Sequence, residues 1–141
     1  IWQKLRQEFY NACQIYLQSV DNFCQNQDRM DVTGYGAWVY KGWKDLDRAE
    51  GNPWHNHNPA FLSGVYYLHD PGDGTKGGTE FHDPRIAAAY GTRMQEILPI
   101  ENTWIIFPGW LNHKSVQLGL DEPRYVVAAN LYVKVADGSG K

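Results

Sequence analysis

The chain has few cysteines and no long hydrophobic run, and each shortage excludes a class of protein. Its two cysteines, Cys13 and Cys24, lie within one stretch of helical pattern. There they are expected to be small core residues, not a disulfide or a pair of metal ligands. No apolar run approaches the length of a membrane span, and no signal-peptide pattern opens the chain. We therefore expect a cytoplasmic protein with no membrane partner.

Positive charge is also scarce. The formal net charge is −3 at pH 7, and lysine and arginine are not gathered into a basic run. This balance argues against electrostatic binding to nucleic acid or to an anionic membrane surface. What the chain does contain is aromatic side chains, which make up 14% of it and include six tryptophans and nine tyrosines. Such residues favour strands and the walls of concave pockets.

The spacing of apolar residues predicts one helix followed by strands. From residue 1 to about 26, apolar side chains recur at helical spacing, which predicts an amphipathic helix packed on one face of a sheet. From residue 30 the period changes to two, and the glycines at 34 and 36 indicate a β-bulge. The runs of strand pattern cover 30–43, 61–68, 79–81, 96–99, 103–107 and 124–135.

Regular turn signals separate these runs. The glycine-rich stretch 70–78 is expected to be a hairpin loop that joins the strands on either side of it. One helix followed by many short strands predicts a mainly β protein, either a β-sandwich or a jelly roll. The length suits one domain over residues 1–141.

Two histidines one residue apart, His55 and His57, precede the second predicted strand. In an extended chain residues i and i+2 point the same way, so both imidazoles are expected on one side. A third histidine, His113, follows another strand-like run, and a β-barrel can bring two such segments together. Neutral imidazole is a common ligand of transition metals. The pattern predicts a metal site, although three imidazoles alone suit zinc, copper, iron and nickel alike.

Arg124 begins the strand that follows His113, and on a jelly roll the two strands would be neighbours. Its guanidinium presents a planar fork of donors that matches a carboxylate. A metal with open positions beside a buried arginine indicates a dicarboxylate held at both ends. Tyr67 lies an even number of residues from Ser63, shares its strand face and is expected to add a hydroxyl at the far carboxylate. The competing interpretation is a salt bridge between Arg124 and an acidic residue of the preceding turn.

Several stretches resemble the Fe(II)- and 2-oxoglutarate-dependent oxygenase superfamily, in particular a group of small bacterial and phage-type oxygenases. They are His55-Asn56-His57, Ser63-Gly64-Val65-Tyr66-Tyr67-Leu68, Gly77-Gly78-Thr79-Glu80-Phe81, Asp83-Pro84-Arg85, Phe107 through His113, and Arg124 through Asn130. The double tyrosine and the glycine pair also resemble the prolyl-hydroxylase branch. The stretches span roughly residues 50 to 133, and their order and spacing together are more specific than any one of them.

This resemblance implies a double-stranded β-helix, as in cupins, with iron at one end of the barrel. His55 would be the proximal histidine and His113 the distal one. Arg124 would bind 2-oxoglutarate, with Tyr67 assisting. The implied activity is that of a dioxygenase that uses Fe(II), 2-oxoglutarate and O2, hydroxylates an unidentified protein or small molecule, and releases succinate and CO2.

One departure from the family pattern concerns the third ligand. The superfamily usually has a carboxylate two residues after the first histidine, where this chain has His57. Either His57 is a third neutral ligand, which we favour because its spacing delivers it to the metal, or Asp83 completes the triad. Imidazole in place of a carboxylate makes the site more positive by one charge, which changes the affinity and redox potential of iron.

The same departure keeps other functions open. Three-histidine iron sites occur in O2-using enzymes that need no 2-oxoglutarate, so a cupin-type dioxygenase or isomerase is the second hypothesis. The third is a metal-free binding module on the same scaffold. Arg124 favours the first hypothesis over the second, and the three histidines together favour either enzyme over the third.

Overall fold

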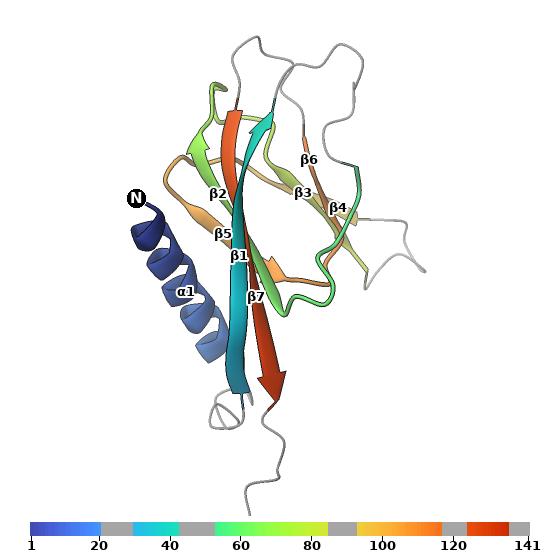
Figure 1. Cartoon of the computed structure of the whole chain (residues 1–141). Helices are drawn as coiled ribbons and strands as arrows, with labels where there is room; N and C mark the ends of the chain where they lie inside the picture. Colours follow the sequence, from blue (N-terminus) through green and yellow to red (C-terminus); the bar gives the residue numbers. More distant parts are fainter. Residues whose placement is uncertain (21–29, 43–52, 85–92, 117–123, 136–141) are drawn as a thin grey trace, which may run out of the picture.

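The computed structural model describes residues 1–20, 30–42, 53–84, 93–116 and 124–135. Its elements are α1 (Trp2–Ser19), β1 (Met30–Gly42), β2 (Leu62–His69), β3 (Thr79–Asp83), β4 (Arg93–Ile97), β5 (Trp104–Pro108), β6 (His113–Ser115) and β7 (Arg124–Val135). Four strands form one sheet in the order β1-β7-β2-β5, and three form a second in the order β4-β3-β6, with all pairs antiparallel. Figure 1 shows α1 on one side of the larger sheet and the smaller sheet on the other. The prediction of a mainly β protein with an N-terminal helix packed on one sheet is confirmed.

The helix buries a single apolar face against the larger sheet. Its buried residues recur at helical spacing and are Leu5, Phe9, Cys13 and Leu17. They pack, in two clusters, on side chains that alternate along β2 and β7, namely Leu62, Tyr66, Val127, Ala129 and Leu131. The helix ends earlier than predicted because Val20 has an extended backbone. Residues 21–26 and Cys24 lie outside the described residues. Within the described part of the chain, no helix is both long and apolar enough to cross a membrane.

Gly64 of β2 allows the close approach of α1. A Cβ atom built on it would lie 2.8 Å from the Phe9 ring and 2.9 Å from Ile106. Real Cβ atoms do not sit that close to carbon, so the helix can pack at this distance only above a residue with no side chain. The alternate residues of β2 face the other way, toward the smaller sheet.

The strand face that looks toward the smaller sheet carries buried polar side chains. Ser63 lies opposite Asn130 in the β2–β7 register, and its hydroxyl donates to the Asn130 Oδ1 at 2.8 Å. Tyr67, on the same face of β2, shares a 2.8 Å hydrogen bond with the hydroxyl of Thr79 in β3. This last bond joins the two sheets. The space between the sheets is therefore closed by specific polar contacts as well as by apolar packing.

Long-range pairing places Arg124 at the end of the larger sheet. β1 and β7 pair from Met30 opposite Val135 to Gly42 opposite Arg124. The register shifts between Val32 and Gly34, which confirms the predicted bulge. β2 also ends here, since its last residue pairs with the residue after Arg124.

Two predicted strand relationships are wrong. The stretch 70–78 is not a hairpin loop, because β2 and β3 belong to different sheets and the chain crosses between them. Gly74 and Gly77 still allow the chain to turn, since they have positive φ angles of 75° and 85° that favour glycine. The strands that carry His113 and Arg124 are not neighbours in a sheet either, because β6 belongs to the smaller sheet and β7 to the larger.

Candidate metal centre and carboxylate site

Two segments that are far apart in the sequence pair with each other. His55 and His113 form an antiparallel bridge in which each backbone N–H donates to the other carbonyl at 3.0 Å. The N–H of His57 donates to the Gly109 carbonyl at 2.8 Å, which ties the same segment to the turn before β6. Backbone pairing therefore brings the two histidine segments together.

The three imidazoles converge on one point. Each histidine has a ring nitrogen that lies within 4.8 Å of a ring nitrogen of each of the other two. The ring centroids are 4.4 Å apart for His55 and His113, 5.0 Å for His57 and His113, and 5.1 Å for His55 and His57. The Nε2 atoms of His57 and His113 are 3.2 Å apart. Asp83, the alternative third ligand, is not a member of this group.

Backbone carbonyls orient two of the rings. His55 Nδ1 lies 2.7 Å from the Pro53 oxygen, and His113 Nδ1 lies 2.9 Å from the Leu111 oxygen. A carbonyl oxygen only accepts hydrogen bonds, so each Nδ1 carries the proton and each Nε2 keeps a lone pair. A ring N–H held by a backbone carbonyl is a common support for a metal-binding histidine, because it fixes both the tautomer and the ring orientation.

Burial disfavours the protonated form of two of the imidazoles. His113 is 3% exposed, and the Phe107 ring lies 4.6 Å from its own ring. This burial, together with the neighbouring His55 and His57, lowers the pKa of His113 to about 4, although its bond to Leu111 acts in the opposite direction. Burial, and then the charge of His55, also lowers the pKa of His57. Because a metal binds neutral imidazole, these shifts keep the ligand form available below neutral pH.

The donor set fits a divalent transition metal such as Fe(II). Ligand nitrogens about 2.1 Å from an ion stand about 3 Å apart when they are adjacent around it. The 3.2 Å between the Nε2 atoms of His57 and His113 matches this separation. Imidazole suits iron as well as zinc, copper and nickel, so the donors alone do not select among these metals.

Arg124, the first residue of β7, reaches the chain that follows β6. Its Nε donates to the Asp70 Oδ1 at 2.6 Å, and its Nη2 lies 2.6 Å from the same oxygen. Its Nη1 donates to the carbonyl of Val116, the residue after β6, at 3.3 Å. His113 therefore stands at one end of β6 and Arg124 contacts the other. Contact between the two sheets, and not strand pairing, brings Arg124 to the chain that follows β6.

The guanidinium is buried and already faces one carboxylate. Nη2 is buried and, among the described residues, has no acceptor in hydrogen-bond geometry, although it contacts the Asp70 carboxylate. The Arg124 side chain is 12% exposed and that of Asp70 is 4% exposed. A second carboxylate oxygen in line with Nη2 would complete its hydrogen bonding.

Tyr67 lies beside this guanidinium. The Cζ of Arg124 is 5.7 Å from the centre of the Tyr67 ring, and the Tyr67 hydroxyl bonds to Thr79. Burial raises the pKa of Tyr67, while the bond to Thr79 and the charge of Arg124 lower it by less. Its hydroxyl is therefore protonated at neutral pH and able to donate. Sequence reasoning missed both Asp70 and Thr79, because each stands beside a glycine-rich turn where an aspartate or a threonine is ordinary turn chemistry.

His69 and His82 lie outside the group of three clustered histidines. His69 Nδ1 pairs with Glu101 at 3.1 Å. The His82 ring meets the edge of Trp54 with centroids 6.0 Å apart. Trp54 is 39% exposed and Trp110 is 54% exposed, so both flank the histidine segments at the surface and are not core residues.

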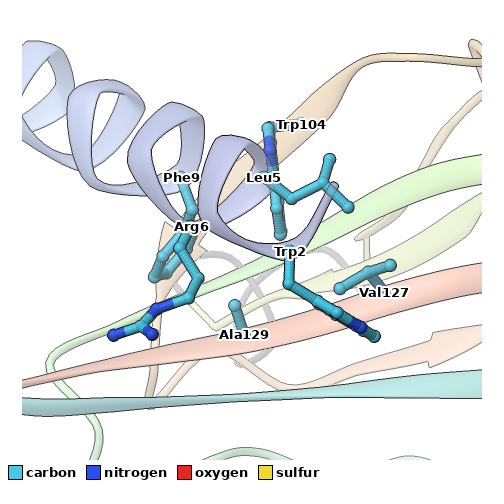
Figure 2. Close-up of a pocket in the computed structure, with 7 residues that line it drawn as sticks. All are labelled: Trp2, Leu5, Arg6, Phe9, Trp104, Val127 and Ala129. Carbon is cyan, nitrogen blue, oxygen red and sulfur yellow. The ribbon is translucent and has the colours of Figure 1, made fainter.

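A separate pocket lies on the opposite face of the larger sheet. Figure 2 shows it between α1 and the sheet, and its lining residues are Trp2, Leu5, Arg6, Phe9, Trp104, Val127 and Ala129. The lining is mostly apolar and includes none of the three histidines. Helix packing, not chemistry, accounts for this pocket.

Comparisons with known proteins agree with this geometry. Residues 42–130 match the family described as "Putative 2OG-Fe(II) oxygenase", where 2OG is 2-oxoglutarate. A comparison with curated proteins found no match. Among solved structures, the chain is similar to a Pseudomonas putida prolyl-4-hydroxylase, with a TM-score of 0.54, 15% sequence identity, and coverage of 89% of this chain and 68% of that one.

The prolyl-4-hydroxylase likeness concerns the fold alone. Protein NMB1881 from Neisseria meningitidis is more distant, with a TM-score of 0.38, 14% identity, and coverage of 72% of this chain and 79% of that one. The family match is the stronger finding, because it spans more than half of the sequence and includes all three clustered histidines and Arg124. The chain therefore belongs to this 2OG-Fe(II) oxygenase family.

Proposed function

We propose that the protein is an Fe(II)- and 2-oxoglutarate-dependent dioxygenase that hydroxylates a protein side chain or a small molecule. One oxygen atom of O2 enters a C–H bond of the substrate, and the other enters the succinate formed when 2-oxoglutarate loses CO2. The observation that carries this proposal is that β6 has the imidazole cluster at one end and Arg124 at the other. Family membership supports the same chemistry.

In this proposal His55, His57 and His113 hold the metal, and His57 takes the place of the usual carboxylate. The Nδ1 bonds of His55 and His113 to backbone carbonyls keep their Nε2 atoms available as ligands. When bound, Fe(II), 2-oxoglutarate and O2 supply the oxidising chemistry. Phe107 and Phe81, whose rings lie 4.6 Å and 5.9 Å from that of His113, keep water away from the inner side of the cluster.

Arg124 is proposed to bind the distal carboxylate of 2-oxoglutarate, with the Tyr67 hydroxyl as a second donor. Along β6, the step from His113 to Val116 spans about 10 Å. A five-carbon dicarboxylate placed between a metal and a guanidinium requires a distance of this order. The two facing sheets would then be the halves of a double-stranded β-helix, with the cosubstrate between them.

One observation favours a second candidate, a three-histidine metal enzyme that does not use 2-oxoglutarate. Arg124 already has a carboxylate partner in Asp70. On this alternative the ion pair is structural, and the metal centre acts alone. The two candidates differ in whether Arg124 matters for the chemistry.

Succinate formation tests the proposal. Purified protein supplied with Fe(II), O2 and 2-oxoglutarate should release succinate, and Arg124→Ala should abolish the release while retaining bound iron. Lys4→Ala is the matched control, because Lys4 is an exposed cation on α1 that pairs with Glu8, and its loss should leave the rate unchanged. Succinate release that persists in Arg124→Ala would remove the role proposed for that residue. Its absence from the iron-loaded natural protein would favour the second candidate.

A further inference from the structure

Asp70 and Arg124 form a buried ion pair to which the proposed chemistry assigns no role. A single oxygen, Asp70 Oδ1, lies 2.6 Å from both Nε and Nη2 of the guanidinium. Stability alone is a weak reason for such a pair, because well-packed apolar residues often replace buried ion pairs without loss. One member of the pair is Arg124, the residue proposed to bind the cosubstrate, which indicates a functional reason for the pair.

The backbone at Asp70 is held in place by neighbouring groups. Its N–H donates to Glu101 Oε1 at 2.7 Å, and the same oxygen lies 3.1 Å from His69 Nδ1. The N–H of Asn102 donates to the carbonyl of Tyr67 at 2.9 Å, which fixes the strand just before Asp70. The carboxylate is therefore presented to Arg124 without any ligand being required.

The charges show what this arrangement does to an incoming anion. The Asp70 carboxylate neutralises the guanidinium, and histidine ligands bound to a metal are neutral. A second carboxylate at Arg124 therefore meets a pair with no net charge and is repelled by Asp70 at short range. Both side chains are almost fully buried, so water screens this repulsion poorly.

We infer that Asp70 is the resting occupant of Arg124 and competes with the distal carboxylate of 2-oxoglutarate, so that Asp70 sets the affinity for this cosubstrate. Asp70 also keeps the guanidinium in position while no cosubstrate is bound. It is an affinity-determining residue and not a catalytic one, since it is placed against Arg124 and not at the metal cluster. The inference rests on the proposed function for the identity of the ligand.

The test compares the natural protein with Asp70→Asn, which keeps the shape and an acceptor oxygen but removes the charge. Each protein is loaded with Fe(II) under anaerobic conditions, and 2-oxoglutarate binding is measured by calorimetry together with the unfolding temperature. Asp70→Asn should bind about tenfold more tightly, which equals about 1.4 kcal/mol. It should unfold at a lower temperature without ligand, because the buried guanidinium loses its counter-charge, and gain more from 2-oxoglutarate.

Asp73→Asn is the matched control. Asp73 lies in the same stretch between β2 and β3, but its carboxylate is exposed and bonds to Thr75, so the variant should bind like the natural protein. Asp70→Ser, which also removes the charge, is the second variant if Asp70→Asn does not fold. It should shift the affinity in the same direction.

The outcomes separate this inference from the proposed function. Equal or weaker binding by the Asp70 variants, with normal binding by the natural protein, overturns the inference and leaves the oxygenase proposal intact. Binding by Asp70→Asn alone would show that Asp70 blocks the site, which overturns 2-oxoglutarate use by the natural protein and, with it, the inference that Asp70 sets a working affinity. Absence of binding in every protein overturns both.

Discussion

Acid should destabilise the metal-free protein through His113 before most carboxylates are protonated. Its pKa in the folded protein is lowered to about 4, while an unfolded histidine titrates at about 6.5. The unfolded state therefore binds more protons between these two pH values. Stability conferred by the neutral buried imidazole is complete above about pH 6.5 and is lost as the pH falls toward 4.

The magnitude follows from the difference between the two pKa values. One unit corresponds to 1.36 kcal/mol, so the loss reaches about 2 kcal/mol at pH 5 and about 3 kcal/mol at pH 4. Because His113 is 3% exposed, little of this is screened by solvent. His57 contributes in the same direction, since its pKa is also lowered. A loss of this size is a large share of the stability of a small domain.

Urea unfolding of the chelator-treated protein between pH 7 and pH 5 measures this loss. His113→Gln is the comparison, because it removes the titrating group and keeps a polar side chain of similar reach. It should be less stable at pH 7 but lose less stability on acidification than the natural protein. If both proteins lose the same free energy of unfolding between pH 7 and pH 5, the account of His113 as a buried neutral imidazole is refuted.

Two further changes test the neighbouring groups. His57→Ala should lose most of the bound iron, measured by elemental analysis, whereas Asp83→Ala should retain it, because only His57 belongs to the imidazole cluster. The opposite result would make Asp83 the third ligand. Thr79→Val should lower the free energy of unfolding by about 1–3 kcal/mol, since it leaves the buried Tyr67 hydroxyl without its partner. Thr103→Val, at an exposed position, is the control for urea unfolding, and equal losses in the two would contradict this reason.

The shared orientation of His55 and His57 could be predicted because its determinants are local, whereas the approach of His113 depends on long-range pairing. The two-residue spacing of His55 and His57 places both rings on one side of an extended segment whatever the rest of the fold does. The helix could also be predicted from the sequence, since Leu5, Phe9 and Cys13 repeat at the helical period and all face the sheet. Both features depend on spacing within a few residues.

Sheet membership could not be predicted, because it depends on contacts between distant segments. The glycines of 70–78 indicate that the chain turns, but the same turn chemistry serves a hairpin and a crossing between two sheets. The partner of Arg124 was missed for a related reason. The competing interpretation named Asp121 or Glu122, which lie outside the described residues, whereas the described partner is Asp70, 54 residues away in the sequence. No periodicity links two such positions.

The position of the carboxylate gives one physical reason why a third histidine can replace an acidic ligand here. In the usual site with two histidines and one carboxylate, the carboxylate ligand brings one negative charge to the metal. In the proposed site the three histidine ligands are neutral, so the metal keeps its double positive charge. The negative charge lies instead on Asp70, which is paired with Arg124. A dicarboxylate is then attracted mainly to the metal, because the Asp70–Arg124 pair offers hydrogen bonds but no net charge. Metal binding is therefore expected to precede cosubstrate binding, with Arg124 then holding the distal carboxylate.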